Sequence, residues 1–310
     1  MLYYRYSDFL KNKYGEKVYK LPLSLPCTCP NRDGRLSNRG CIFCGNIGTG
    51  FELYPASMDI KEQLESNRRR IGPAYGAKKY IAYFQNYTNT YLPAVELEGY
   101  LEQAVVDGVV QISLSTRPDC VSESCLAMLQ RFSQRHTIDI SIELGLQTVN
   151  YHTLKKINRG HTLAEFIDTV LRIQKRGFET GVHVILNLPW DNDTDAIETA
   201  KILSALRVDT VKLHSLYILK DSELGRMYQN HEFQLISAEE YIERAILFLE
   251  YLSPEIAVQR LLARAPEGDA LFCNWGMSWW KLKDEIERVM KESGRIQGKL
   301  CHYLNGNAFF

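Results

Sequence analysis

Four of the chain's eight cysteines fall within nineteen residues, in the segment CTCPNRDGRLSNRGCIFCG from Cys27 to Gly45. Only two residues separate Cys41 from Cys44, a spacing at which one turn directs both sulfurs toward a common centre. The eleven residues between Cys29 and Cys41 are rich in Asn, Asp, Gly and Ser, which favour turns. The segment therefore predicts a metal centre held by thiolates, with a loop wrapped around it.

Two kinds of metal centre suit these cysteines. If Cys27 takes part, four thiolates complete the tetrahedral ligand set of a structural zinc ion. If only Cys29, Cys41 and Cys44 take part, three thiolates hold an iron–sulfur cluster and leave one iron open to a ligand from outside the protein. Cys27 and Cys29 are one residue apart on a predicted strand, so their side chains should point to opposite faces. This spacing favours the three-ligand interpretation.

The composition is that of an ordinary globular protein. The chain has 310 residues, 45% of them hydrophobic, which is enough for one large domain or slightly more. The opening segment MLYYRYSDFLKNKYG has no apolar run of signal-peptide length, and no later segment is apolar enough to cross a membrane. We therefore expect a cytoplasmic protein without a membrane partner, in which clustered cysteines are metal ligands or reactive thiols and not disulfides.

Apolar, β-branched and aromatic runs alternate with helical patterns about six times. The predicted strands are residues 17–25, 79–84, 109–115, 139–146, 181–188 and 210–218. The predicted helices are residues 59–70, 94–106, 122–133, 163–171, 195–206 and 237–252. Such alternation implies parallel strands joined by right-handed crossovers, either as a barrel or as a doubly wound sheet.

Side-chain alternation along the strands decides between these two folds. In ISIELGLQ, residues 140–147, the apolar residues occupy one face, whereas Ser, Glu, Gly and Gln occupy the other. The polar residues that share one side of the third to sixth strands are Gln111, Ser113, Ser115, Glu143, Gln147, His183, Asn187, Lys212 and His214. A closed eight-stranded barrel fills its interior with bulky apolar side chains, and each unpaired buried polar group costs about 1–3 kcal/mol. A wide, incomplete barrel whose lumen holds a polar ligand fits this pattern better.

The predicted fold class is therefore α/β, with a partial (β/α)6 TIM-like barrel over residues 1–255. A C-terminal extension over residues 256–310 should pack on this barrel. The extension contains a last strand within IAVQRL, a loop with Pro266 and Gly268, and a helix from about Trp279.

The cysteine segment and several further motifs together resemble one family. The motifs are CTCPNRDG, GCIFC, YFQNYTNTY, STRPDC, ELGLQT, INRGHT and VKLHSLYILK, and they lie between about Lys17 and Arg260. In this order they are similar to radical S-adenosylmethionine enzymes of the YhcC/YtqA type, relatives of the elongator-like and coproporphyrinogen-dehydrogenase-like branches. The usual superfamily motif has three residues between the first two cysteines, and this chain has eleven.

This resemblance implies the cofactors and their chemistry. Cys29, Cys41 and Cys44 would hold a [4Fe–4S] cluster whose fourth iron is chelated by S-adenosylmethionine. One electron, from a reductase or a flavodoxin- or ferredoxin-type donor, would then cleave the cofactor to a 5′-deoxyadenosyl radical that abstracts a substrate hydrogen. By position on matching strands, the residues expected to contact S-adenosylmethionine are Ser115, Thr116, Glu143, Gln147, Arg159 and His183.

The resemblance also suggests a substrate, the wobble uridine of tRNA, whose 5-carboxymethylaminomethyl side chain would become 5-aminomethyl. The zero net charge, from 37 basic and 37 acidic residues, gives this hypothesis no general electrostatic support. Local patches such as Arg68–Arg70, Lys78 and Lys79 could nevertheless suffice for an RNA contact. Two alternatives stay open: a radical enzyme acting on a small metabolite or a peptide, and a zinc-stabilised binding module without catalysis. The oligomeric state is not predicted.

Overall fold

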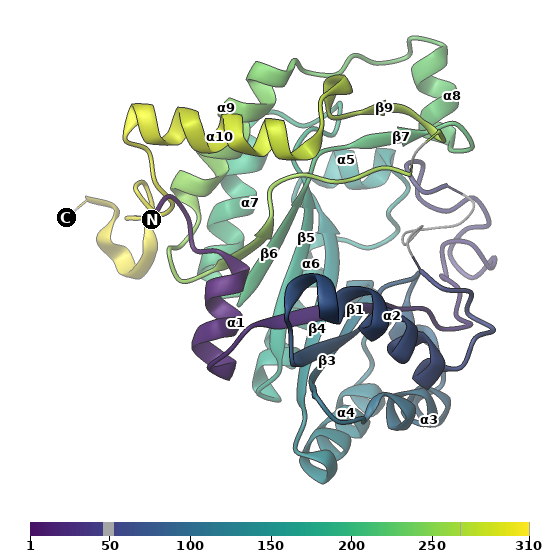
Figure 1. The fold of residues 1–310 in the computed structure, drawn as a ribbon. Coiled ribbons are helices and arrows are strands. Elements are labelled where there is room, and N and C mark those ends of the chain that lie inside the picture. Colours follow the sequence, from purple (N-terminus) through teal and green to yellow (C-terminus); the bar gives the residue numbers. More distant parts are fainter. Residues whose placement is uncertain (46–52, 267, 310) are drawn as a thin grey trace.

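Seven parallel strands form one curled sheet at the centre of the molecule (Figure 1). The computed structural model describes residues 1–45, 53–266 and 268–309. The strand order is β1-β2-β3-β4-β5-β6-β8. The strands are β1 (Val18–Leu23), β2 (Lys79–Phe84), β3 (Val109–Thr116), β4 (Asp139–Gln147), β5 (Glu179–Ile185), β6 (Thr210–His214) and β8 (Ala257–Arg260). The predicted α/β fold with an incomplete TIM-like barrel is thus confirmed, and β8 is the last strand expected in the extension.

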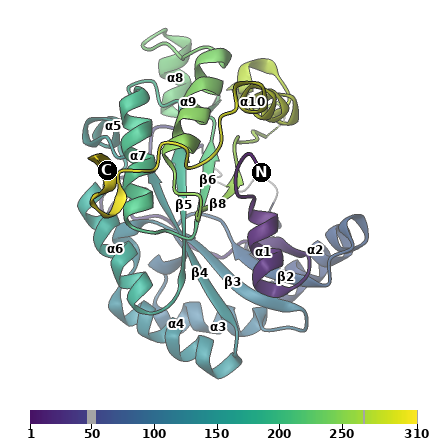
Figure 2. The same cartoon turned by 90° about the vertical axis from the view of Figure 1, so that its left-hand side faces the viewer.

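Helices cover the outer, convex face of this sheet (Figure 2). One helix follows each of the first six strands: α2 (Ile60–Tyr75), α3 (Ala94–Ala104), α4 (Glu123–His136), α6 (Leu163–Lys175), α7 (Asp193–Ala205) and α9 (Ala238–Tyr251). Complete capping boxes at Thr162, Asn192 and Ser237 fix where α6, α7 and α9 begin. These six crossovers are the ones that the periodicity of the sequence predicts.

The main hydrophobic core lies between these helices and the sheet. The apolar residues of β4, including Ile142 and Leu144, are fully buried there, together with Phe166 and Val170 of α6. The predicted alternation is therefore confirmed, because the apolar face of the sheet packs against helices. The polar face is left to line the inside of the half-barrel.

Several shorter elements have no counterpart in the sequence prediction. The helices are α1 (Tyr6–Tyr14), α5 (Tyr151–Lys156) and α8 (Glu223–Gln229), and the 3-10 turns are η1 (Asn89–Tyr91), η2 (Pro118–Cys120), η3 (Asn274–Gly276) and η4 (Leu304–Phe309). The segment predicted as one strand over residues 210–218 breaks after β6, and its second half is β7 (Tyr217–Leu219). β7 pairs antiparallel with β9 (Ala270–Cys273).

The last α-helix of the described residues is α10 (Trp279–Ser293), which begins where the sequence predicts. The N-terminal segment runs beside β8, because the backbone N–H of Val258 donates to the Tyr4 carbonyl at 2.8 Å and Arg5 forms a parallel bridge to Val258. The domain boundary at residue 255 stays a prediction. Among the described residues, none of the helices has the length and apolar character that crossing a bilayer requires.

Candidate active site

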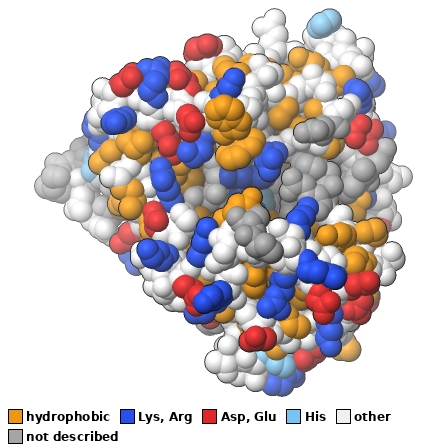
Figure 3. Space-filling view, in the orientation of Figure 1, with side chains coloured by type: hydrophobic (Ala, Val, Ile, Leu, Met, Phe, Trp, Pro, Cys, Tyr) orange, Lys and Arg blue, Asp and Glu red, His pale blue; other side chains and the backbone are white. Residues whose placement is uncertain are grey.

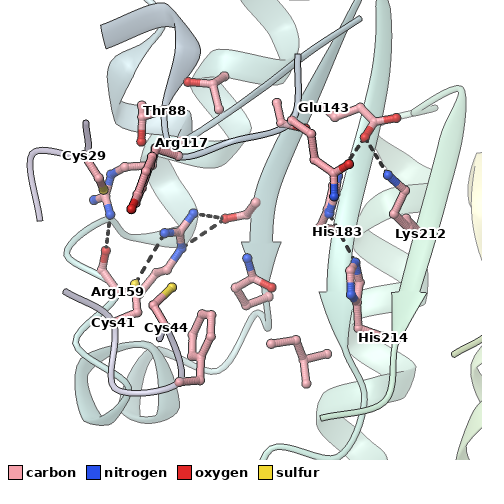
Figure 4. Close-up of a pocket in the computed structure, with 18 of the residues that line it drawn as sticks. Cys29, Cys41, Cys44, Thr88, Arg117, Glu143, Arg159, His183, Lys212 and His214 are labelled. Carbon is pink, nitrogen blue, oxygen red and sulfur yellow. Dashed lines mark hydrogen bonds and ion pairs between the residues drawn. The ribbon is translucent and has the colours of Figure 1, made fainter. Parts of the chain in front are cut away.

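A cavity of about 210 Å³ opens where the carboxyl ends of the parallel strands meet. All nine predicted site residues line it: Cys29, Cys41, Cys44, Ser115, Thr116, Glu143, Gln147, Arg159 and His183. The fold thus gathers residues from distant parts of the sequence into one site, and their ligand roles stay predictions. Figure 4 shows two groups, with the cysteines on one wall and Glu143 with its partners on the other.

Two asparagines anchor the loop that carries the cysteines. Asn31, which is 1% exposed, donates from Nδ2 to the Asn158 carbonyl and lies 3.5 Å from the Cys41 sulfur. Asn158 in turn donates from Nδ2 to the Gly40 carbonyl at 2.7 Å. The turn-rich loop between Cys29 and Cys41 is therefore tied to the segment after α5, which holds Cys41 at the cavity wall.

The Cys41 thiol is prepared to ionise. Its hydrogen bond with Cys44, assisted by the guanidinium charges of Arg159 and Arg117, holds the pKa of Cys41 well below its usual value despite burial. The same hydrogen bond and burial raise the pKa of Cys44. Thiolates are the species that bind metals, so this wall favours metal ligation at Cys41.

Cys27 lies apart from this group and does not line the cavity. Its sulfur is 3.6 Å from the Asn86 carbonyl, and burial raises the pKa of the thiol to about 12. The absence of Cys27 from the cavity agrees with the three-ligand interpretation. The argument from side-chain alternation on a strand, however, is wrong. β1 ends at Leu23, so Cys27 and Cys29 follow a turn and not an alternating strand.

The donor set fits a four-iron cluster. Among residues 1–45, 53–266 and 268–309, no three His, Cys, Asp or Glu side chains surround one point as a single metal ion requires. A four-iron cluster does not require this, because each thiolate binds a different iron. The three cysteines share one cavity wall with two guanidinium groups that offset thiolate charge, so Cys29, Cys41 and Cys44 are the residues that would hold the cluster.

Arg159 connects the cysteine wall to β4. It donates from Nε and Nη2 to the Gly145 carbonyl at 3.2 and 2.8 Å, and its Nη1 lies 3.6 Å from the Cys41 sulfur. A Cβ atom on Gly145 would lie 2.6 Å from Arg159 Nη2, so a larger residue here would displace the guanidinium from its present position. Arg117 holds the backbone of Arg159 through its carbonyl at 2.8 Å and is itself paired with Asp119. If Arg159 also binds a cofactor carboxylate, as the sequence predicts, it must do so while keeping its bonds to Gly145 and Cys41.

Other polar residues of the lining differ in whether their side chains already have hydrogen-bond partners. The Gln147 side-chain amide makes no hydrogen bond with the described residues, and its backbone has a φ of 75°, a left-handed conformation that is costly outside glycine. The buried hydroxyl of Thr88, also in the cavity lining, has no partner in the described part of the chain. Ser115 and Thr116 are paired with Tyr83 and Thr90, respectively. Gln147 and Thr88 are therefore best placed to bind a ligand.

The opposite wall is built around the Glu143 carboxylate, which is 2% exposed. Lys20 and Gln259 donate to Oε1, whereas Lys212 and His183 donate to Oε2 at 2.9 and 2.8 Å. Although burial acts to raise it, the pKa of Glu143 stays well below its usual value because of the positive charges of Lys20 and Lys212. With four donors, Glu143 has little capacity left for the cofactor contact that the resemblance implies.

His183 is occupied in the same way. Its Nε2 lies 2.8 Å from Glu143, and its Nδ1 lies 3.2 Å from Nε2 of His214. The other His214 nitrogen, Nδ1, accepts from Nη2 of Arg260 at 2.6 Å. Burial is the main cause that lowers the pKa of His183 to about 4, and it also lowers the pKa of His214. Both imidazoles are neutral at pH 7. The three hydrogen bonds from Arg260 to Glu143 can form together only if each imidazole carries its proton on Nε2.

Sequence reasoning missed three cationic residues of the lining: Arg117, Arg260 and Arg264. Arg117 directly follows β3 inside the STRPDC motif, and Arg260 is the last residue of β8. Both stand at the carboxyl end of a parallel strand, which is the position that identifies site residues in such folds. Of the nine polar residues predicted to face the lumen, Gln111, Ser113 and Asn187 do not line the cavity.

Comparisons with known proteins agree with this site. The model of the Radical SAM superfamily matches residues 34–203, and that of the Radical_SAM C-terminal domain matches residues 208–292. The uncharacterized protein YtqA of Bacillus subtilis is 32% identical over 303 residues, which are 97% of this chain and 94% of that protein. Protein YhcC of Escherichia coli is 33% identical over 290 residues, which are 93% of this chain and 92% of that protein.

A more distant match is the tRNA uridine(34) acetyltransferase of Methanocaldococcus jannaschii, 27% identical over 138 residues, which are 43% of this chain and 24% of that protein. Among solved structures, Elp3 of Methanocaldococcus infernus has a TM-score of 0.68 at 15% identity. The match covers 90% of this chain and 64% of the Elp3 chain. That likeness supports the fold. The superfamily model spans more than half of the chain, and relatives about one-third identical extend over nearly all of it. The chain therefore belongs to the radical S-adenosylmethionine superfamily, whose members use a [4Fe–4S] cluster and S-adenosylmethionine.

Proposed function

We propose that this radical S-adenosylmethionine enzyme remodels the side chain of the tRNA wobble uridine, converting 5-carboxymethylaminomethyl to 5-aminomethyl. The observation that carries the RNA part is the similarity to a protein named tRNA uridine(34) acetyltransferase over 43% of this chain. The Elp3 fold, which covers 90% of the chain, is consistent with it. Membership of the superfamily already excludes the alternative of a zinc-stabilised module without catalysis.

The bound cofactors supply a one-electron cleavage of S-adenosylmethionine whose product removes a hydrogen atom from the substrate. The protein's own contribution is to hold the two cofactors and to orient the substrate beside them. The cysteine wall provides thiolates, while Gln147 and Thr88 offer unpaired polar atoms for the organic cofactor. The electron donor that we propose is a reductase or a flavodoxin- or ferredoxin-type protein.

The charge of the cavity favours an anionic substrate. Among its described lining residues, six carry a cationic side chain and only Glu143 carries a carboxylate. In the space-filling view, Lys and Arg side chains surround a hollow in this face of the molecule (Figure 3). RNA phosphates and the carboxylate of the proposed nucleoside both suit such a surface.

The basic patches suggested by the sequence are in a different place. Lys79 is the first residue of β2, whereas Tyr83, near the end of the same strand, lines the cavity. Arg68 lies over the ring of Tyr80, also near the start of β2. Arg68–Arg70, Lys78 and Lys79 are thus at the end of the barrel away from the cavity.

Two exposed tryptophans offer a better surface for RNA. Trp279 and Trp280, at the start of α10, are 40% and 50% exposed. The Arg264 guanidinium, which lines the cavity, lies 5.5 Å from the Trp279 ring centre, and Lys281 lies 5.5 Å from that of Trp280. Aromatic rings flanked by cations stack unpaired bases. A base next to the target nucleotide would be bound here.

Nucleoside analysis tests the proposed reaction. In tRNA from a strain lacking the gene, mass spectrometry should show the 5-carboxymethylaminomethyl nucleoside accumulating at the expense of the 5-aminomethyl product. The wild-type gene should restore the profile, and a Cys41→Ala gene should not. An unchanged wobble profile would rule the substrate out.

An anaerobic assay for 5′-deoxyadenosine tests the chemistry separately. Reconstituted protein should release it when a reductant, S-adenosylmethionine and substrate tRNA are present. If release instead follows addition of a small metabolite or a peptide, the radical chemistry stands and the tRNA substrate is wrong.

A further inference from the structure

The strand wall of the cavity holds more positive than negative charge. Lys20, Lys212 and Arg260 gather around the single carboxylate of Glu143. The two nearby imidazoles, His183 and His214, have lowered pKa values and are neutral at pH 7. Buried charges are stable when they are paired. With Lys212 protonated, this wall therefore lacks anionic partners.

Arg260 is the least satisfied of the three cations. Its Nη2 donates to His214, but its buried Nε–H has no partner among the described residues, and no carboxylate there lies within ion-pair distance of its guanidinium. Lys212 donates to Glu143 and to the Tyr83 hydroxyl, each at 2.9 Å, which leaves one of its three N–H groups. Both side chains line the cavity. The Arg260 Nε–H is enclosed, but Nη1 makes no hydrogen bond with the described residues and is not enclosed, so Nη1 and the remaining Lys212 N–H can meet a ligand there.

The hydrogen-bond chain around them keeps these donors in place. It runs from Arg260 through His214 and His183 to Glu143, and each imidazole accepts at Nδ1 and donates from Nε2. Because every ring nitrogen in the chain is used, the imidazoles neither neutralise Arg260 nor bind the missing anion. They orient the guanidinium by holding one of its edges.

We propose that Arg260 and Lys212 form a binding site for a carboxylate of the substrate, on the wall of the cavity opposite Cys41. This proposal deepens the proposed function and rests on it for the identity of the substrate, since the carboxymethyl group of the nucleoside supplies the anion. The site lies on the strand wall, away from the cysteines that would hold the cluster (Figure 4). It would also distinguish the substrate from the product, because 5-aminomethyluridine has lost that carboxylate.

Lys212 adds a measurable signature. Burial lowers its pKa to about 7, so this side chain titrates close to neutral pH. A bound carboxylate stabilises the charged form and raises this pKa, so binding should take up protons above pH 7 and weaken as the pH rises. The titratable or charged groups that face Lys212 come from six strands: Lys20, Tyr83, Glu143, His183, His214 and Arg260.

Acetate and its neutral isostere acetamide are suitable probes. They would be titrated at pH 7 into the reconstituted protein with S-adenosylmethionine bound, and followed by saturation-transfer NMR. Acetate should bind more tightly than acetamide, and Arg260→Gln should weaken acetate binding at least about tenfold. Calorimetry in buffers of different ionisation enthalpy should show proton uptake with acetate at pH 8 and almost none at pH 6.

Two controls exclude a structural effect. Arg39→Gln removes an exposed arginine outside the cavity and should leave acetate binding unchanged. Arg260→Lys keeps the charge and should retain part of the binding if Arg260→Gln fails to fold. The affinity of the Arg260 variants for S-adenosylmethionine should equal that of the wild type, and a parallel loss would mean that the site serves the cofactor and overturn the proposal.

A second pair of probes separates this inference from the proposed function. The nucleoside 5-carboxymethylaminomethyluridine should bind more tightly than 5-aminomethyluridine, and Arg260→Gln should remove the difference. If acetate binds as expected but the two nucleosides bind alike, the carboxylate site stands and the proposed substrate is wrong. Equal binding of acetate and acetamide, or acetate binding that does not depend on Arg260, overturns the inference.

Discussion

The two walls of the cavity satisfy their polar groups in opposite ways. On the cysteine wall, a loop carries the reactive groups, and Asn31 and Arg159 approach the Cys41 sulfur without filling the space around it. On the strand wall, regular strands carry the groups, and Glu143 and His183 use their polar atoms on one another. The cysteine wall is therefore arranged to bind a ligand. On the strand wall, the polar groups already satisfy one another except at Arg260 and Lys212.

This difference separates two roles that sequence patterns treat alike. A polar residue on the inner face of a strand can be a ligand or a part of the framework, and alternation cannot distinguish them. The number of partners can. Glu143 has four donors and belongs to the framework, whereas Gln147, near it on the same strand, has none.

The largest effect should come from the cysteine wall. Cys41→Ala removes a ligand whose thiolate is stabilised by its surroundings, so we expect complete loss of the cluster and of 5′-deoxyadenosine formation. Iron and sulfide content and the visible absorption of anaerobically reconstituted protein would measure this. Cys27→Ala is the matched control and should keep the cluster. If Cys27→Ala loses the cluster and Cys41→Ala keeps it, the ligand assignment is wrong.

The strand wall should respond in stability. Glu143→Gln leaves Lys20 and Lys212 without their shared carboxylate, so the free energy of unfolding should fall by about 3–5 kcal/mol. Urea denaturation at pH 7 measures it, with Glu96→Gln, at an exposed position in α3, as the control.

The pH dependence of this loss has a definite sign. Because the folded-state pKa of Glu143 lies well below its unfolded value of about 4.5, its contribution is present above pH 4.5 and is lost only in stronger acid. The difference between wild type and Glu143→Gln should therefore persist at pH 5. Its disappearance at that pH would mean that Glu143 is not held ionised by its lysines.

Arg159 joins the two walls, so its substitution sharpens the comparison. Arg159→Lys keeps a positive charge but cannot bond both the Gly145 carbonyl and the Cys41 sulfur. We expect cluster affinity to fall about 10- to 100-fold, as for other partners of metal ligands, with little loss of folding stability. Competition with an iron chelator would measure it, and Arg39→Lys should have no effect. Retained affinity would show that Arg159 serves β4 alone.

The smallest effect should lie outside both walls. Trp280→Ala removes an exposed ring next to Lys281, and we expect tRNA to bind about tenfold more weakly, the value of one lost stacking contact. The affinity for S-adenosylmethionine should not change. Leu171→Ala, at an equally exposed apolar position on α6, is the control for fluorescence-monitored tRNA binding. Equal effects of the two variants would remove α10 from the RNA surface.

The sequence was sufficient to predict the repeated elements. The six strands and the helices that follow them are visible as periodic apolar runs, because each strand has one face in the core. The same periodicity brought Glu143, His183, Lys212 and His214 to one face, and all four line the cavity. The cysteine spacing pointed to the remaining wall.

Other features depend on contacts between distant segments, which no local pattern encodes. Arg260 enters the site only because β8 pairs with β6, after the β7 segment has left the sheet. The break after His214 is invisible in TVKLHSLYI, which contains no Gly or Pro and continues with apolar residues beyond the break. The pairing of Glu143 with Lys20 joins residues 123 positions apart, so the framework role of Glu143 had no signal in its own motif.

The N-terminal segment has a consequence for work with this protein. Tyr4 and Arg5 bond to the backbone of Val258, and so cover part of the outer edge of the strand that ends in Arg260. Unprotected edge strands promote association between molecules. Trimming these first residues, or forcing them away with a bulky fusion, would open that edge to aggregation and would loosen the cavity wall from a distance.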